Sequence, residues 1–200
     1  TTYSVTCTPT QSSNLILNGG FESSSDFGNW TNWQSAGITT TAGEFRTGSK
    51  AARIIASSDW GGFAQELAAT PGQFYTVSYW AKMNNTNAEG NLTVKFLNSS
   101  YTQISNITTQ RVTSTSWVKY TLTALAPINT AYIQISADAG EVSIMYVDDV
   151  EVYRSTGCTS TDSGTVTVIT NDNITLGTPV VSAAINHPLL DVATVSVQVS

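Results

Sequence analysis

Short segments in which apolar and polar residues alternate make up most of the chain. The clearest is 74–83, reading FYTVSYWAKM, where every second residue from Tyr75 to Ala81 is apolar or aromatic and Trp80 falls on the opposite, polar face. Alternation with a period of two is the pattern of a half-buried β-strand. The dipeptide Pro71-Gly72, a strong turn signal, marks where this strand begins.

The same alternation, interrupted by short turns, predicts strands along most of the remaining chain. These segments are 14–18, 36–41, 49–56, 60–67, 92–96, 101–112, 116–125, 130–137 and 141–153. No stretch of useful length has the helical period. Many short strands at this spacing favour an all-β fold, a jelly-roll β-sandwich.

Two motifs near the ends of this strand-rich region are expected to lie side by side. The first, NLILNGGFE at 14–22, reads as a short strand followed by a turn at Gly19-Gly20, because glycine tolerates the positive φ of a tight turn. The second, YVDDV at 146–150, belongs to the last strand of the region. We therefore expect the first and last strands to be neighbours.

The predicted strands and the polar links between them divide the chain into three parts. Residues 1–13 form a β extension, 14–158 the β-sandwich, and 159–200 a β-rich extension that is too short for a two-sheet core of its own. Its last segment, 191–199, has a valine face, which would be an aggregation hazard if unpaired. We expect this segment to pair in a sheet with its own module or with a neighbouring subunit, or to belong to a truncated domain.

Composition places the chain among hydroxyl-rich, secreted or cell-surface β proteins. Charged residues make up only 11% of the 200 residues, while Thr, Ser and Asn are abundant. The net charge of −6 leaves no basic stripe for nucleic acid. No apolar run approaches the roughly 20 residues of a membrane helix, so membrane insertion is not expected.

The two cysteines, Cys7 and Cys158, lie just outside the two motifs. If the first and last strands are neighbours, the thiols face each other, and an oxidising compartment favours a disulfide between them. Two unrelated free thiols are the alternative. Asn-X-Ser/Thr sequons, which permit a glycoprotein, occur at Asn29, Asn84, Asn91, Asn98, Asn106 and Asn173.

The residues do not indicate an active site, and we expect a protein that is not an enzyme. The sequence lacks the GxSxG, HExxH and phosphate-loop motifs. Its single histidine, His187, precedes a proline in the tail. Asp148 and Asp149 are adjacent, whereas the two acids of a glycosidase face each other across a cleft. A distant pair such as Glu66 and Glu141 stays open as an alternative.

Taken in order, several motifs resemble those of carbohydrate-binding modules of the family 4/9/16/22 type, which are galactose-binding-like jelly rolls. The matching pieces lie within residues 14–153 and are NLILNGGFE, Trp33, GSKAARI, FAQEL, PGQFYTVSYWAKM, SWVKYTLT and YVDDVEVY. The ordered set is fairly specific for the fold and much less specific for a ligand. The resemblance implies a jelly-roll sandwich that binds polysaccharide.

The resemblance also implies a structural calcium ion beside the first and last strands. By position, Glu22 and Asp148 would give side-chain oxygens, and Asp149 would assist. Gly20 and Lys50 would give backbone carbonyls. This set suits calcium, which takes about six to eight oxygens from carboxylates, carbonyls and water. The alternative is that the two aspartates are only polar residues at a strand end.

Sugar binding needs flat apolar rings that stack on sugars, with amide or carboxylate groups for the hydroxyls. The candidate rings are Trp80, Trp60, Tyr101 and Trp30, and the candidate hydrogen-bonding groups are Gln65 and Gln134, with Glu66 and Gln103. Trp80 is foremost because it lies between polar residues of its strand. Trp117 and Trp33 are expected to be structural. The alternative for every candidate ring is packing beneath a loop.

Two functions fit these observations. The first is a secreted, non-catalytic carbohydrate-binding module that holds a polysaccharide on a sheet face. The second is a structural subunit of an extracellular filament or adhesin, whose partners are copies of itself joined by β-strand addition through the terminal extensions. Fold class alone does not separate the two functions.

Overall fold

The computed structural model describes residues 4–6, 10–23, 27–56, 60–86, 89–108, 111–140, 142–156 and 192–194. The chain folds into two compact units. One unit is Ser12–Arg154, and the other combines Thr1–Gln11 with Ser155–Ser200. The described residues contain no helix of the length and hydropathy needed to cross a membrane.

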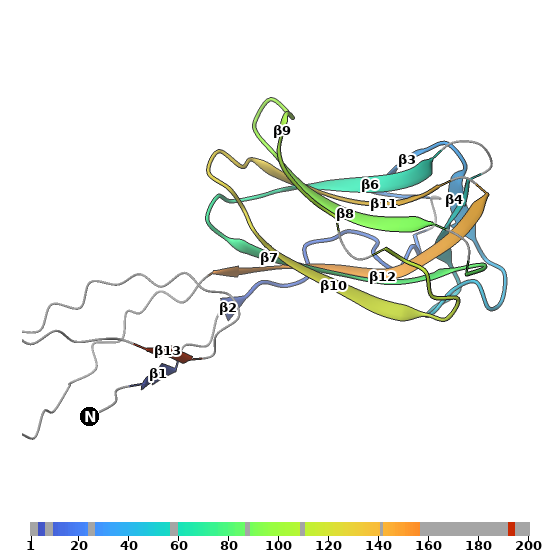
Figure 1. Cartoon of the computed structure of the whole chain (residues 1–200), viewed down its shortest axis with the longest axis horizontal. Helices are drawn as coiled ribbons and strands as arrows, with labels where there is room; N and C mark the ends of the chain where they lie inside the picture. Colours follow the sequence, from blue (N-terminus) through green and yellow to red (C-terminus); the bar gives the residue numbers. More distant parts are fainter. Residues whose placement is uncertain are drawn as a thin grey trace, which may run out of the picture. The chain divides into compact units, whose positions relative to one another are not determined.

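Two antiparallel sheets lie face to face and form the sandwich (Figure 1). The five-stranded sheet has the order β3 (Thr31–Trp33), β6 (Gly61–Ala68), β11 (Tyr132–Ala139), β8 (Gly90–Leu97) and β9 (Gln103–Thr108). The six-stranded sheet has the order β10 (Val118–Leu125), β7 (Phe74–Met83), β12 (Ser143–Thr156), β5 (Ala51–Ala56) and β4 (Ala36–Thr39), and β2 (Thr10–Gln11) pairs with β12. The prediction of an all-β jelly-roll sandwich is confirmed.

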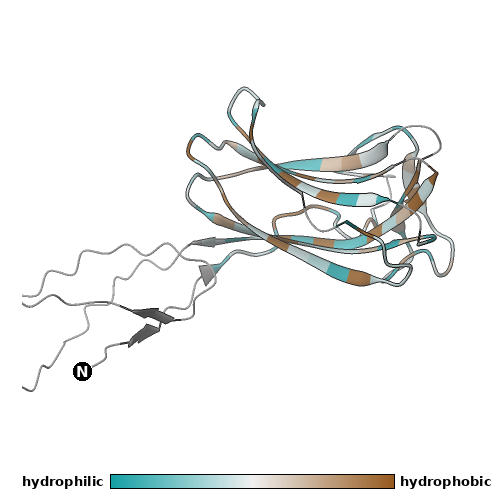
Figure 2. Ribbon diagram, in the orientation of Figure 1, coloured by the Kyte–Doolittle hydropathy of each residue, from teal (hydrophilic) through white to brown (hydrophobic). Residues whose placement is uncertain are grey.

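The core fills the space between the two sheets. The inward-facing residues of β7 are Tyr75, Val77, Tyr79 and Ala81, as their alternation predicts, and all four are buried. Opposite them lie inward-facing residues of β8 and β11, among them Val94 and Phe96 of β8. Figure 2 shows the resulting alternation of hydrophobic and hydrophilic residues along the strands.

The first motif is not a strand, contrary to prediction. Residues 12–16 run beside β12 without forming a strand, held by bonds such as Leu15 N–H to Val152 O at 2.8 Å. Without the pleat, the predicted alternation does not apply: Ile16 is buried and Leu17 is exposed. The predicted neighbourhood of the first and last segments is confirmed, because the Val150 N–H also donates to Gly19 O at 2.9 Å.

The turn predicted at Gly19-Gly20 is present, because Phe21 N–H donates to Asn18 O at 3.1 Å, but positive φ is not the reason for the glycines. Positive φ occurs at Asn18 (52°) and Phe21 (58°), which flank the pair, and at neither glycine. A β-carbon at Gly19 would overlap Val150 O and lie 2.8 Å from the Ile16 side chain. Gly19 is therefore needed for the close approach of the first motif to β12 rather than for a positive φ in the turn.

The terminal extensions form a small sheet of their own. Strand β1 (Ser4–Thr6) pairs antiparallel with β13 (Val192–Thr194). Part of the predicted strand at 191–199 is thus paired within its own chain, with the N-terminal extension as its partner. Cys7, Cys158 and most of the extension at 159–200 lie outside the described residues, so the disulfide and the β-rich character of that extension stay predictions.

Candidate functional site

The solvent side of the five-stranded sheet, which we call the outer face, presents a row of polar side chains. In β11 the core takes Ile133, Ile135, Ala137 and Ala139. Because side chains alternate along a strand, Gln134 and Asp138 point outward. The register places Glu66 of β6 and Lys95 of β8 opposite Gln134. Residues directly opposite in neighbouring strands share a face, so one row joins these three side chains.

Two tryptophans lie on this outer face with part of each ring in solvent. Trp60 is 43% exposed and Trp33 is 38% exposed. Trp33 is directly opposite Gly62 in the register, and its ring approaches that glycine. Trp60 continues β6 by one residue, and its ring approaches Gly140, which continues β11. The two indole surfaces therefore lie near one end of the face, level with Asp138 and Asn91, and the polar row lies farther along the same face.

A tyrosine pair adds a further ring to this face. Tyr132 points outward from β11, and Tyr101 stacks on it with ring centroids 4.5 Å apart and an interplanar angle of 11°. Tyr101 is 58% exposed, so its other side faces solvent. The hydrogen bond with Tyr132 is the main cause that raises the pKa of Tyr101, and the charge of Glu66 makes the smallest contribution in the same direction. The tyrosine pair therefore belongs to the same face as the polar row.

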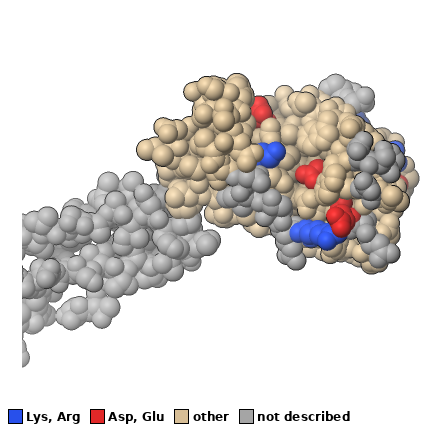
Figure 3. Space-filling model, turned by 45° about the horizontal axis from the view of Figure 1, so that its top comes forward, with Lys and Arg blue, Asp and Glu red and all other residues tan. Residues whose placement is uncertain are grey.

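The polar groups of the outer face bond to one another and leave capacity for a ligand. Gln134 Nε2 donates to Glu66 Oε1 at 2.7 Å, and Asn91 Nδ2 donates to Asp138 Oδ1 at 3.2 Å. Burial raises the pKa of Asp138, against the effects of Asn91 and Lys95. The surface seen in Figure 3 is mostly uncharged, with few acidic and basic side chains. Such a face suits a polar, uncharged ligand.

Trp80, the foremost candidate from the sequence, lies on the other side of the sandwich. It points outward from the six-stranded sheet, and the guanidinium of Arg46 lies 3.6 Å from its ring centroid. Trp117, predicted to be core, is only partly buried, and Lys82 Nζ lies 5.1 Å from its ring centroid. Both rings are therefore engaged by cations of the protein itself.

Two further candidates are parts of the interior. Trp30 is 5% exposed, stacks on Phe21 with a centroid distance of 5.4 Å, and donates its indole N–H to Asn18 O. Gln65 is 4% exposed and binds both the N–H and the carbonyl of Leu17, each at 2.9 Å. The prediction of both as sugar ligands is corrected, because their polar groups are already bonded and a sugar cannot reach them.

Of the predicted sugar ligands, the structure therefore brings Trp60, Tyr101 and Gln134 to one face. Sequence reasoning missed Trp33, Tyr132, Asn91, Lys95 and Asp138, which complete it. The signal for Asn91 and Lys95 was the alternation of β8, whose apolar residues Leu92 and Val94 point inward. Trp33 was expected to be structural, and hydrophobic alternation could not place it on the outer face because β3 is too short to show a period.

The predicted calcium ligands gather at the loop formed by residues 46–50. Glu22 Oε1 accepts the N–H groups of Ser49 and Lys50, each at 2.8 Å, and Oε2 accepts the Ser49 hydroxyl at 2.8 Å. Burial opposes ionisation of Glu22, but these bonds outweigh it and hold its pKa below the ordinary value. Glu22 thus ties the first motif to the loop.

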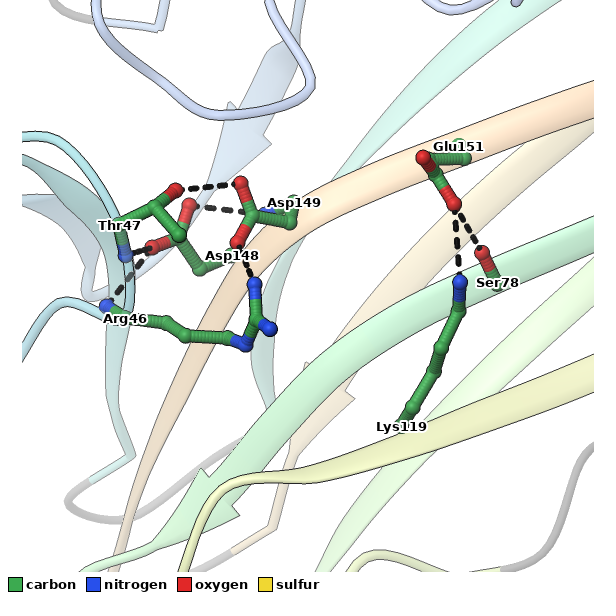
Figure 4. A network of polar contacts seen from close by, with 7 residues as sticks. All are labelled: Arg46, Thr47, Ser78, Lys119, Asp148, Asp149 and Glu151. Atoms are coloured by element: carbon green, nitrogen blue, oxygen red, sulfur yellow. Dashed lines mark hydrogen bonds and ion pairs between the residues drawn. The ribbon is translucent and has the colours of Figure 1, made fainter.

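The two aspartates of β12 hold the other end of the loop (Figure 4). Asp148 Oδ2 accepts the N–H groups of Arg46 and Thr47 at 2.8 and 3.1 Å, and Asp149 accepts the Arg46 guanidinium and the Thr47 hydroxyl, each at 2.6 Å. Asp148 is fully buried, and burial raises its pKa to about 6 despite these donors.

The carboxylates of Asp148 and Asp149 could supply part of the ligand set of a calcium ion. A β-carbon at Gly20 would lie 3.7 Å from Asp149 Oδ1 and 4.0 Å from Asp148 Oδ1, so two hard oxygens converge beside this glycine. Within the described residues, no three acidic, histidine or cysteine side chains form a group that could hold a metal. Backbone carbonyls would therefore have to complete the ligand set, which is common for calcium.

Comparison with known families identifies the sandwich. Residues 13–140, more than half of the chain, match the model of the family described as carbohydrate binding domain, of the CBM 4/9 type. The chain belongs to this family, as its motifs predicted. No curated protein matches the chain in sequence.

Solved structures show the same fold at low sequence identity. The family 16 carbohydrate binding module-2 has a TM-score of 0.56 and 18% identity, over 70% of this chain and 99% of its own. The CBM22-1–GH10 modules of a Clostridium thermocellum xylanase, complexed with xylohexaose, have a TM-score of 0.57 and 22% identity over 71% of this chain. The enzymatically active domain of bacteriophage CBA120 tailspike protein 4 has a TM-score of 0.58 and 18% identity over 70% of this chain. The chain spans only 28% of the xylanase structure and 21% of the tailspike structure.

Proposed function

We propose that this protein is a non-catalytic module that binds a polysaccharide on the outer face of its five-stranded sheet. The observation that carries the proposal is that Trp33 and Trp60, both partly exposed, lie on the same face as the polar row of Gln134, Glu66 and Lys95. Indole rings stack on the C–H surfaces of sugars, and amides and carboxylates bond to hydroxyls. Membership of the carbohydrate binding domain family supports the same class of ligand.

The side chains of the outer face suit binding better than hydrolysis. Hydrolysis of a glycosidic bond needs two carboxylic acids with a separation fitted to the bond. Of the described acids on this face, Glu66 is bonded to Gln134 and Asp138 is bonded to Asn91. Both contacts are suited to orienting amides toward sugar hydroxyls, so we assign these acids to binding.

We further propose that a calcium ion stabilises the loop at 46–50 and that the protein works outside the cell. Calcium is supported by the two carboxylates that converge beside Gly20. A location outside the cell is supported by the hydroxyl-rich, weakly charged composition. The calcium ion would have a structural role, because Asp148 and Asp149 belong to the six-stranded sheet rather than to the outer face.

The alternative of a filament subunit has no supporting contact within the described residues. Strand β13, the described part of the tail, pairs with β1 of the same chain. An internal partner removes the main reason for expecting the tail to pair with a second copy.

Affinity electrophoresis tests the proposed function. The protein would be run through native gels that each contain one polysaccharide, beside an inert protein of similar charge. Xylan belongs in the panel because the xylanase modules were complexed with xylohexaose. We expect slower migration with at least one polysaccharide. Unchanged migration in every gel would overturn the proposal.

A further inference from the structure

Each exposed tryptophan of the outer face lies against a glycine of the neighbouring strand. The ring of Trp60 covers Gly140, and the ring of Trp33 covers Gly62. At both places the chain lacks the β-carbon that any other residue would direct toward the outer face. The two glycines therefore leave room for indole rings close to the backbone of the sheet.

Gly140 shows this relation most clearly. The three atoms nearest to a β-carbon there would all belong to the Trp60 ring, at 2.9 Å for Cζ2, 3.1 Å for Cε2 and 3.2 Å for Cη2. The two neighbours of Cζ2 are only slightly farther away than Cζ2 itself, as expected for a point above the ring face. In edge-on contact they would be much farther. The face of the indole, rather than its edge, thus covers Gly140.

Backbone conformation does not explain this glycine. The glycines with positive φ are Gly28, Gly43, Gly48 and Gly72 among the described residues, and Gly140 is not one of them. An alanine would therefore fit the backbone of residue 140 without strain. What an alanine would not fit is the indole of Trp60, because β-carbons do not approach other heavy atoms this closely.

Gly62 has the same relation to Trp33, with a second constraint. A β-carbon there would overlap Trp33 Cζ2 and also the carbonyl oxygen of Ala137 in β11. The backbone contact means that a substitution at Gly62 would disturb the sheet as well as the ring. Gly140 is therefore the better position for a test.

We propose that Gly140 and Gly62 are positioning residues of the glycan-binding face, which hold Trp60 and Trp33 with one ring face on the sheet and the other toward the ligand. This inference rests on the proposed function. A ring held in its binding orientation before the ligand arrives loses less conformational freedom on binding. A methyl group at residue 140 would lift or tilt the indole, and the sugar would lose its flat partner.

The test compares Gly140→Ala with Gly37→Ala. Gly37 also lies in a strand, β4, also lacks a positive φ, and has open space around its β-carbon position. Binding would be measured on the polysaccharide that most retards the wild-type protein. We expect Gly140→Ala to weaken binding about tenfold or more and to approach the loss in Trp60→Ala, which is roughly thirtyfold for a typical hot spot. Gly37→Ala should bind like the wild type.

A double-mutant cycle separates positioning from a general structural effect. In the Trp60→Ala background, Gly140→Ala should have no further effect on binding, because the ring that it displaces is gone. If the loss of affinity in the double variant equals the product of the losses in Trp60→Ala and Gly140→Ala, the inference is overturned. Binding by Gly140→Ala that equals that of the wild type would also overturn it.

A readout without ligand keeps the inference testable if the proposed function fails. The indole N–H resonance of Trp60 can be assigned by its disappearance in Trp60→Ala. Gly140→Ala should shift this resonance and leave that of the buried Trp30 in place, while Gly37→Ala shifts neither. An unchanged Trp60 resonance in Gly140→Ala would overturn the positioning role, whether or not the wild-type protein binds a polysaccharide.

Discussion

Trp60 and Trp80 lie on opposite sides of the sandwich and have different neighbours. Trp60 is seated on Gly140 with its other side exposed, whereas the guanidinium of Arg46 covers Trp80. A stacked indole in a binding site contributes about 2 kcal/mol or more. A cation–π contact at a partly exposed site contributes about 0.5–1 kcal/mol to stability.

We therefore expect Trp60→Ala to weaken polysaccharide binding by roughly thirtyfold with an unchanged melting temperature. Trp80→Ala should lower the melting temperature and leave binding intact. Affinity electrophoresis and thermal melting of the two variants check both statements. Loss of binding in Trp80→Ala alone would move the site to the six-stranded sheet.

Gln65 and Gln134 form a second contrasting pair. Gln65 is buried and binds both backbone groups of Leu17, whereas Gln134 points outward and donates to Glu66. Gln65→Leu leaves a buried contact unsatisfied and should lower the free energy of unfolding by about 1–3 kcal/mol. Gln134→Leu should change stability by less than about 0.5 kcal/mol and weaken binding. Denaturant unfolding and affinity electrophoresis of both variants check this, and a stable, non-binding Gln65→Leu would contradict it.

The sequence predicted single residues well only where one pattern controls them. The alternation of 74–83 correctly placed Tyr75 and Tyr79 inside, because both neighbours of β7 follow the same pleat. It could not tell that Arg46 covers Trp80, since that contact depends on where a loop of a distant segment lies. Trp33 and Trp60 reach one face only through the register of β3, β6 and β11, which is a property of the pairing and not of any one strand.

At the scale of elements, the loop at 46–50 is held by carboxylates from two sides. Glu22 binds it from the first motif, and Asp148 and Asp149 bind it from β12. A calcium ion beside Gly20 would offset the cost of burying Asp148 as a charged group.

We expect a chelator to lower the melting temperature of the protein by about 5 °C or more. This is the effect of removing an ion whose concentration was well above its dissociation constant. Added calcium, but not magnesium, should restore it, because magnesium demands a smaller and more regular site. Glu22→Ala serves as the control, since it should melt lower and lose its sensitivity to the chelator. Identical melting of the wild-type protein with and without chelator would refute the calcium proposal.

The pairing of β1 with β13 gives a prediction for the tail. Deleting residues 190–200 removes β13, so the amides of Ser4–Thr6 lose their partner. We expect these amides to exchange their hydrogens faster in the deletion variant, while β7 and β11 keep their protection. Hydrogen exchange followed by mass spectrometry checks this, and light scattering should show the same number of copies per particle for both forms. Fewer copies per particle in the deletion variant would instead indicate that the tail joins two copies.

The existence of most strands was predicted better than their boundaries, and segments that alternate like strands without forming one were not recognised. The strand expected at 74–83 matches β7, and the turns at Pro71-Gly72 and elsewhere separate strands as expected. The segment at 14–18 has strand-like alternation but bonds to β12 at isolated points, because Gly19 brings it close to Val150. Tertiary contact decided that segment, and local sequence carries little information about such contacts.

At the scale of the whole molecule, the net negative charge of the chain and the few charges on its outer face bear on which polysaccharides could bind there. The chain has a net charge of −6, and the outer face carries Lys95 together with two acids, Glu66 and Asp138. Acidic polysaccharides, rich in uronate or sulfate, would be repelled by this face and by the chain as a whole. Neutral chains avoid that repulsion and can use both the indoles and the amides.

We therefore expect neutral polysaccharides to retard the protein and acidic ones of the same backbone to retard it less. Stacking and uncharged hydrogen bonds are little affected by salt, so binding of the neutral ligand should change by less than about twofold between low salt and roughly 0.5 M NaCl. Glu66→Gln removes a negative charge while leaving an amide oxygen to accept from Gln134. This variant should therefore show a smaller difference in retardation between neutral and acidic polysaccharides. Affinity electrophoresis at two salt concentrations measures all three effects. Stronger binding of the acidic ligand, or release of the neutral one by salt, would show that Lys95 rather than the indoles dominates recognition.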